Sequence, residues 1–106
     1  MKVCNIPSFK ADFDTNKKST VNFLTKAFYQ AIRNQRINEF DDTIYGIKNM
    51  PFGKIALIKT SPDNDVFIVN GIKNKSSLEV TLPKKNNKTC ALDTLIGLGK
   101  ILNQLV

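Results

Sequence analysis

The sequence predicts a single α+β domain, residues 1–106, in which one antiparallel sheet of four to five strands packs with two helices. The hydrophobic residues repeat with the period of a helix over Ser19–Ile37 and Cys90–Leu105, and with the period of a strand between Thr43 and Leu82. Short turns join the predicted strands, which favours an antiparallel meander because parallel crossovers need about a dozen residues or more. The expected order of elements is β-α-β-β-β-β-α.

The N-terminal part is expected to hold one weak strand and one strong helix. Lys2–Ile6 is a short edge strand that Pro7 ends. A polar loop leads to the helix, where the hydroxyl of Ser19 or Thr20 is the expected N-cap. The spacing of the apolar residues predicts a core-facing stripe of Val21, Leu24, Phe28, Ala31 and Ile32. An acidic connection over residues 39–42 follows the helix.

Four strands are then expected, separated by turns rich in Pro, Gly, Asp and Asn. They cover Thr43–Lys48, Lys54–Thr60, Asp65–Asn70 and Ser77–Leu82. The last helix is expected over Cys90–Leu105, with Thr89 as its N-cap.

The last helix is apolar over an arc of about 220°, which is wider than the stripe of an ordinary surface helix. Two interpretations fit this width: the helix is buried on two sides within its own domain, or it shares one side with a second chain. Close approach of a neighbouring backbone would explain its two glycines, Gly97 and Gly99, and so would a kink or a local weakness of the helix. The second interpretation predicts a homodimer with an interface formed by Leu95, Ile96, Leu98, Ile101, Leu102 and Leu105.

The residue types argue against catalysis. The chain contains no histidine, which removes the commonest general acid–base and the commonest metal ligand. Cys4 and Cys90 lie far apart in sequence and offer no zinc-binding pair, so they are interpreted as packing residues. The two Asp-x-Asp sequences, at 12–14 and 63–65, have a spacing that could hold Mg²⁺, but turn hydrogen bonds explain them without a metal. We therefore predict a protein that is not an enzyme and holds no cofactor or metal.

The charge is the most informative property of the composition. Sixteen Lys and Arg residues against nine acids give a net charge of +7, which favours phosphate-rich or acidic partners. One face of the first predicted helix, an arc of about 80°, collects Lys18, Asn22, Lys26, Tyr29, Arg33 and Arg36. The cations of this face suit phosphates, Tyr29 suits base stacking and Asn22 suits a base edge or a phosphate. A solvated helix face would show the same pattern without any ligand.

A second basic patch lies in two loops that flank one predicted strand, and it contains Lys73, Lys75, Lys84, Lys85 and Lys88. These lysines could follow a phosphate backbone, or they could protect a sheet edge against aggregation. Whether the two patches share one side of the molecule depends on tertiary packing.

The favoured hypothesis is a small basic, non-catalytic nucleic-acid-binding protein. Because strands follow the first helix and no helix-turn-helix pattern is present, single-stranded or shape-based contact with DNA or RNA is expected. The alternative is a protein-interaction or inhibitory accessory module of the phage or mobile-element type, docking on an acidic partner protein. No apolar run reaches the ~20 residues of a membrane span, and the N-terminus lacks the apolar region of a secretory signal. We therefore expect a cytoplasmic protein without membrane contact.

Overall fold

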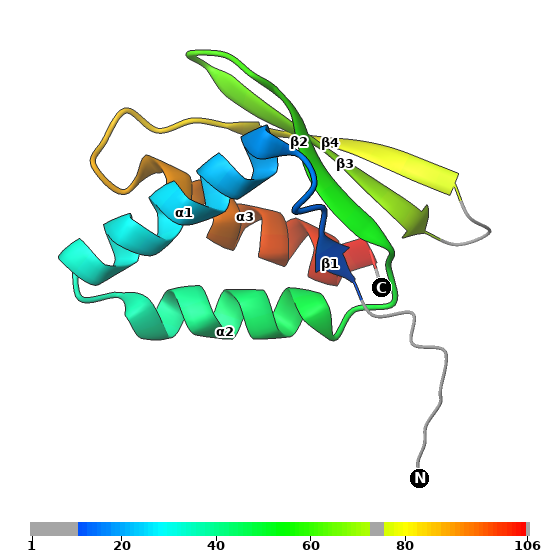
Figure 1. Ribbon diagram of the computed structural model, residues 1–106, viewed down its shortest axis with the longest axis horizontal. Helices are drawn as coiled ribbons and strands as arrows, with labels where there is room; N and C mark the ends of the chain where they lie inside the picture. The colour runs from blue at the N-terminus through cyan, green and yellow to red at the C-terminus, as the bar shows by residue number, and fades with distance from the viewer. Residues whose placement is uncertain (1–10, 73–75, 106) are drawn as a thin grey trace, which may run out of the picture.

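A computed structural model of the chain describes residues 11–72 and 76–105. The described chain forms two layers, a four-stranded sheet and three helices that lie on one face of it (Figure 1). The elements are β1 (Asp12–Phe13), α1 (Lys18–Arg33), α2 (Ile37–Lys48), β2 (Lys54–Thr60), β3 (Asn64–Ile72), β4 (Ser76–Pro83) and α3 (Cys90–Leu105). The α+β prediction is confirmed, and the predicted strand over Lys2–Ile6 lies outside the described residues.

The sheet has the strand order β1-β2-β3-β4 and is mixed. The pairs β2–β3 and β3–β4 are antiparallel, with Ile55 opposite Val69 and Phe67 opposite Val80, as predicted for the meander. The short strand β1 is instead parallel to β2, so the prediction of a purely antiparallel sheet is wrong. The reason is that α1 and α2 together form the long crossover that a parallel pair requires.

The core lies between the sheet and the helices. Side chains alternate along each strand, so Ile55, Phe67, Val69 and Val80 all face the helices and are buried. The helix α3 contacts α1, α2 and β4, and it contributes the fully buried residues Leu95, Leu98 and Leu102. The first interpretation of its wide apolar arc, burial on two sides within one domain, is therefore confirmed.

These contacts bear on the predicted dimer interface. Leu95, Leu98 and Leu102 are already buried within one chain, while Ile96, Ile101 and Leu105 keep some exposure. Gly99 lies against α2, because a Cβ atom added to it would be 3.2 Å from Thr43 Cγ2. The homodimer stays a prediction, and light scattering that finds a monomer at high micromolar concentration would contradict it.

The core-facing stripe of α1 differs from the predicted one. The buried residues are Thr20, Phe23, Ala27 and Ala31, with Leu24 partly buried. Val21, Phe28 and Ile32 are 37%, 38% and 49% exposed, so their assignment to the core is wrong. The rotation has a physical reason, since the small Ala27 and Ala31 side chains let α3 approach α1 closely.

Hydroxyl groups at the start of α1 bind β2 rather than capping the helix. The Ser19 hydroxyl donates a hydrogen bond of 2.8 Å to the Leu57 carbonyl, and the Leu57 N–H donates one of 3.0 Å to Thr20 Oγ1. The N-cap residue is Lys17, which makes no side-chain capping bond, so the predicted Ser19 or Thr20 cap is wrong. The two hydrogen bonds fix α1 to β2 beside the irregularity between Leu57 and Lys59.

The helix α1 ends earlier than predicted, at Arg33, in a Schellman motif. The Arg36 N–H donates to the Ala31 carbonyl at 2.8 Å, and the Gln35 N–H donates to the Ile32 carbonyl at 3.3 Å. Gln35 has φ 57°, the left-handed conformation that usually selects glycine at this position. This motif turns the chain directly into α2.

The segment predicted as the strand Thr43–Lys48 and the acidic connection before it together form the helix α2. The strand prediction is wrong because the apolar spacing continues from before Thr43. Taken together, Ile37, Phe40, Ile44 and Ile47 are spaced by three or four residues, as on one side of a helix. The buried side chain of Ile47 joins the core.

Candidate nucleic-acid interface

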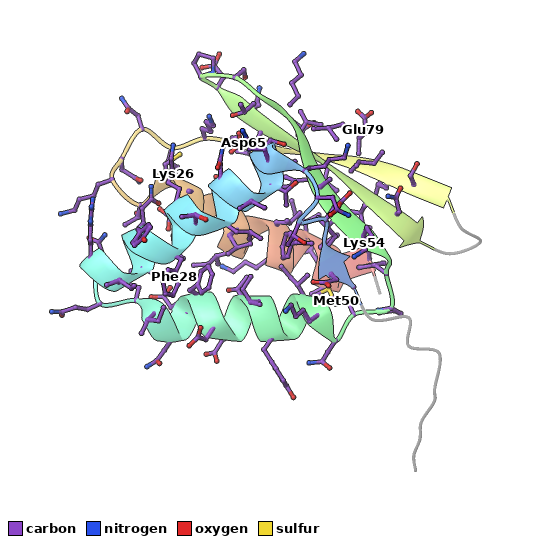
Figure 2. The ribbon with its side chains drawn as sticks, viewed as in Figure 1. Lys26, Phe28, Met50, Lys54, Asp65 and Glu79 are labelled. Carbon is purple, nitrogen blue, oxygen red and sulfur yellow. The ribbon has the colours of Figure 1, made fainter. Side chains whose placement is uncertain are left out.

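Two adjoining hollows lie along α1. The inner hollow, of about 400 Å³, extends from α1 to Thr60, Asp65 and Lys84 at one end of the sheet. The outer hollow, of about 550 Å³, is lined by Lys26, Tyr29, Gln30, Arg33, Asn34 and Lys88. Because Lys26 and Gln30 line both hollows, we treat the two as one groove. Figure 2 shows Lys26 pointing from α1 toward the loop that joins β4 to α3.

The outer hollow unites residues from both predicted basic patches. Lys26, Tyr29 and Arg33 are exposed and follow one another at the i, i+3, i+7 spacing of one helix face. Lys88 comes from the loop after β4 and lines the same hollow. The loop after β4 therefore lies beside α1, and the two basic patches meet at these four residues.

The outer hollow is positive. Its charged lining residues are Lys26, Arg33 and Lys88, and no Asp or Glu among the described residues lines it. Tyr29, 54% exposed, lies on the helix between the two α1 cations. Its ring centroid is 5.9 Å from that of Phe28 at a tilt of 57°, which gives the ring an apolar neighbour.

The other predicted binding residues occupy different places. Asn22 and Lys84 line the inner hollow. Lys18 and Lys85 are exposed but line neither hollow. The two loop lysines Lys73 and Lys75 lie outside the described residues.

Arg36 is not on the predicted basic face, because α1 ends before it. Its guanidinium binds the Glu39 carboxylate through two hydrogen bonds of 2.9 Å and lies 3.2 Å from Asp93 Oδ1 at the start of α3. Arg36 therefore joins α2 to α3, and it lines with Lys85 a separate hollow that shares no residue with the groove.

The Arg36–Glu39 contact changes the proton affinity of both groups. The hydrogen bond from Arg36 lowers the pKa of Glu39, since it favours the carboxylate form. The same bond, with a smaller contribution from Asp93, raises the pKa of Arg36. The Arg36–Glu39 pair is thus formed at neutral pH; it lies at the start of α2, and the contact of Arg36 with Asp93 is the one that reaches α3.

Sequence reasoning missed Gln30 and Asp65. The amide oxygen of Gln30 accepts a hydrogen bond of 3.0 Å from the Leu92 N–H in the first turn of α3. The side chain of Asp65 is buried in the inner hollow with Thr60 and Lys84. A signal for Asp65 was present, because it alternates with Phe67 and Val69 on the buried side of β3.

The described residues contain no group of three or more Cys, Asp or Glu side chains placed to hold a metal ion. None of the described helices is both long and apolar enough to cross a membrane. The chain matches no family model, no curated protein and no solved structure.

Proposed function

We propose that the protein is a non-catalytic binding protein for single-stranded nucleic acid, which it holds in the groove along α1. The observation that supports this proposal is the convergence of Lys26, Tyr29, Arg33 and Lys88 on one hollow from two distant parts of the sequence. Phosphate binding needs cations on fixed elements, and sequence-tolerant base contact needs an exposed aromatic ring. The outer hollow combines both.

The chemistry assigns a role to each side chain. Lys26, Arg33 and Lys88 bind consecutive phosphates, and the Tyr29 ring stacks on a base between them. A duplex presents its bases only at groove edges, so a tyrosine that stacks requires an unpaired strand. We therefore expect tighter binding of single strands than of duplexes.

The experiment is a titration of labelled single-stranded and duplex oligonucleotides at several salt concentrations. Contacts from the three cations of the outer hollow predict a slope of log affinity against log salt of roughly −2 for a single strand. Absence of binding at low salt, or an affinity that does not change with salt concentration, would contradict the proposal.

A matched pair of triple variants separates the groove from the overall charge. Replacing Lys26, Arg33 and Lys88 by alanine removes the charge of the outer hollow. Replacing Lys48, Lys54 and Lys100, which are exposed and line neither hollow, removes the same charge elsewhere. The first variant is expected to lose binding and most of its salt dependence, and the second to keep most of both.

A second candidate function, docking on an acidic partner protein, is favoured by an apolar stripe beside the groove. Val21, Phe28 and Ile32 are exposed along α1 at the spacing of one helix face. Exposed apolar residues next to cations are typical of a protein-binding surface. Under this alternative a nuclease-treated extract yields one acidic protein in stoichiometric amount, and replacing Val21 and Ile32 by serine abolishes its capture. Replacing Tyr45, exposed on α2, by serine is the control.

A further inference from the structure

The inner hollow ends at a buried carboxylate. Asp65 lies near the start of β3, and its side chain is 3% exposed. Its Oδ1 atom accepts a hydrogen bond from the Thr60 hydroxyl and lies 3.4 Å from Lys84 Nζ. Lys84 Nζ in turn donates a hydrogen bond of 2.8 Å to Thr60 Oγ1. The three side chains form a fixed polar cluster on the wall of the hollow.

Both partners of Asp65 use the same oxygen atom. No described residue donates a hydrogen bond to the second oxygen, Oδ2. A buried carboxylate oxygen without a donor is unfavourable, because burial removes the water that would otherwise bind it. A ligand that offers an N–H group in the inner hollow would supply the donor.

The other residues that line the inner hollow indicate the chemistry of a ligand that would fit it. Phe23, Leu57 and Ala91 line it on the apolar side, and Ser19, Asn22 and Asn87 add polar groups to the lining. Lys26 lies where the inner hollow meets the outer one, at the position expected for a phosphate. Figure 2 places Lys26 and Asp65 along the same side of α1. A matching ligand has an apolar face, an N–H donor that reaches Asp65 and a phosphate that reaches Lys26.

We propose that the inner hollow accepts one unstacked base of the bound strand and selects bases that carry an exocyclic amino group. This inference rests on the proposed function. Asp65 Oδ2 accepts a hydrogen bond from the amino group of cytosine, adenine or guanine, a pairing that carboxylates make with base edges. Thymine and uracil are disfavoured, because two carbonyl oxygens flank their ring N–H and repel the carboxylate.

The test compares deoxycytidine and thymidine homopolymers of equal length, since the two bases have similar size and differ in the group that faces Asp65. The protein is expected to bind the cytidine polymer at least about fivefold more tightly, the lower end of the discrimination that such a base contact provides. Equal affinity for the two polymers would overturn the inference and leave the proposed function standing. Failure to bind either polymer at low salt would overturn both.

Asp65→Asn is the decisive variant. Thr60 donates a hydrogen bond to Oδ1 and Lys84 Nζ lies 3.4 Å from the same atom, so the amide oxygen takes that position and the amide N–H₂ replaces Oδ2. The hollow then offers a donor, and the preference for cytidine is expected to disappear or to reverse toward thymidine, whose O4 is an acceptor. Asp63→Asn, at an exposed position two residues away, is the control with the same charge change. A cytidine preference that survives Asp65→Asn contradicts the inference.

A second measurement leaves Asp65 unchanged, so it does not depend on the folding of that variant. Cys90 is a free, partly exposed thiol that lines the inner hollow. In a Cys4→Ser background, alkylation of Cys90 by N-ethylmaleimide is expected to slow when the cytidine polymer is bound. The thymidine polymer at equal saturation is expected to protect it less. Equal protection by the two polymers would overturn the inference.

Discussion

The side-chain oxygen of Gln30 accepts a hydrogen bond of 3.0 Å from the backbone N–H of Leu92. This bond joins the last turn of α1 to the first turn of α3, at the place where the inner and outer hollows meet. The first N–H groups of a helix have no partner within the helix, so Gln30 provides a cap from another element. The same residue thus supports the fold and lines the groove.

Gln30→Ala is expected to lower the free energy of unfolding by about 1 kcal/mol, the usual effect of losing a helix cap. Gln30→Glu keeps an acceptor and places a negative charge at the N-terminus of α3, which the helix dipole favours. It is therefore expected to retain stability and to weaken oligonucleotide binding, because it adds an anion between Lys26 and Arg33. Urea denaturation and a binding titration measure the two effects. Equal stability of Gln30→Ala and the unmodified protein would show that the bond is unimportant.

Two variants of Tyr29 distinguish base stacking by its ring from hydrogen bonding by its hydroxyl in the proposed interface. Tyr29→Phe keeps the aromatic ring and is expected to bind single strands almost as well as the unmodified protein. Tyr29→Ala is expected to weaken binding by about 1–3 kcal/mol, the range observed when a stacked aromatic residue is removed. Because the side chain is largely exposed, both variants should unfold at nearly the same temperature. A strong loss of affinity in Tyr29→Phe would assign the role to the hydroxyl instead.

Arg36→Ala is expected to affect stability and not binding. The substitution removes the contacts with Glu39 and Asp93, which are partly exposed to solvent, so the loss of stability is small, as for other surface ion pairs. Oligonucleotide affinity should fall no more than in Lys48→Ala, a change of equal charge on α2. A loss of affinity as large as that of Arg33→Ala would return Arg36 to the interface.

The same contact predicts a dependence on pH. The pKa of Glu39 in the folded protein is lower than its ordinary value of 4.5, so the ion pair stabilises the fold above that value. Its contribution is lost as pH falls through the lowered pKa. The difference in stability between the unmodified protein and Glu39→Gln is therefore expected to shrink below pH 4.5. A difference that grows toward acid pH would contradict this assignment.

The glycines of α3 differ in the space around them. A Cβ atom on Gly97 would lie 3.6 Å from Leu82 Cδ2, an ordinary contact, so Gly97→Ala is expected to stabilise α3 by up to about 1 kcal/mol. On Gly99 the Cβ atom would lie 3.2 Å from Thr43 Cγ2, so the Thr43 side chain must move by a few tenths of an ångström and the gain is reduced or reversed. Thermal unfolding ranks the stability gains of the two variants against that of Gly46→Ala, where a Cβ atom would meet no neighbour. Equal gains at Gly97 and Gly99 would show that α2 adjusts freely.

Sequence patterns predicted those elements whose hydrophobic period was uninterrupted. The bounds of β2 and α3 agree with the prediction, and β3 and β4 agree within two residues at each end. The failure at α2 has a specific cause: Gln35 adopts the left-handed turn without the glycine that would have marked it. The β-branched residues after Asp42 then resembled a strand, although their spacing with Ile37 and Phe40 is helical.

The groove could be predicted only in part. The helical spacing placed Lys26, Tyr29 and Arg33 on one face, and the structure keeps them there. The meeting of Lys88 with this face depends on how the loop after β4 packs against α1, which no local pattern encodes. Asp65 was assigned to turn chemistry because its neighbours in sequence are turn residues, whereas its burial results from contacts made across the sheet.

The two sides of the groove come from residues far apart in the chain, so the groove exists only when the tertiary structure is complete. A molecule that binds the groove more tightly than it binds the unfolded chain raises the melting temperature as its concentration rises above Kd. A thermal-shift screen of nucleotides, oligonucleotides and acidic peptides can therefore reveal the natural occupant of this surface, whatever its chemical class.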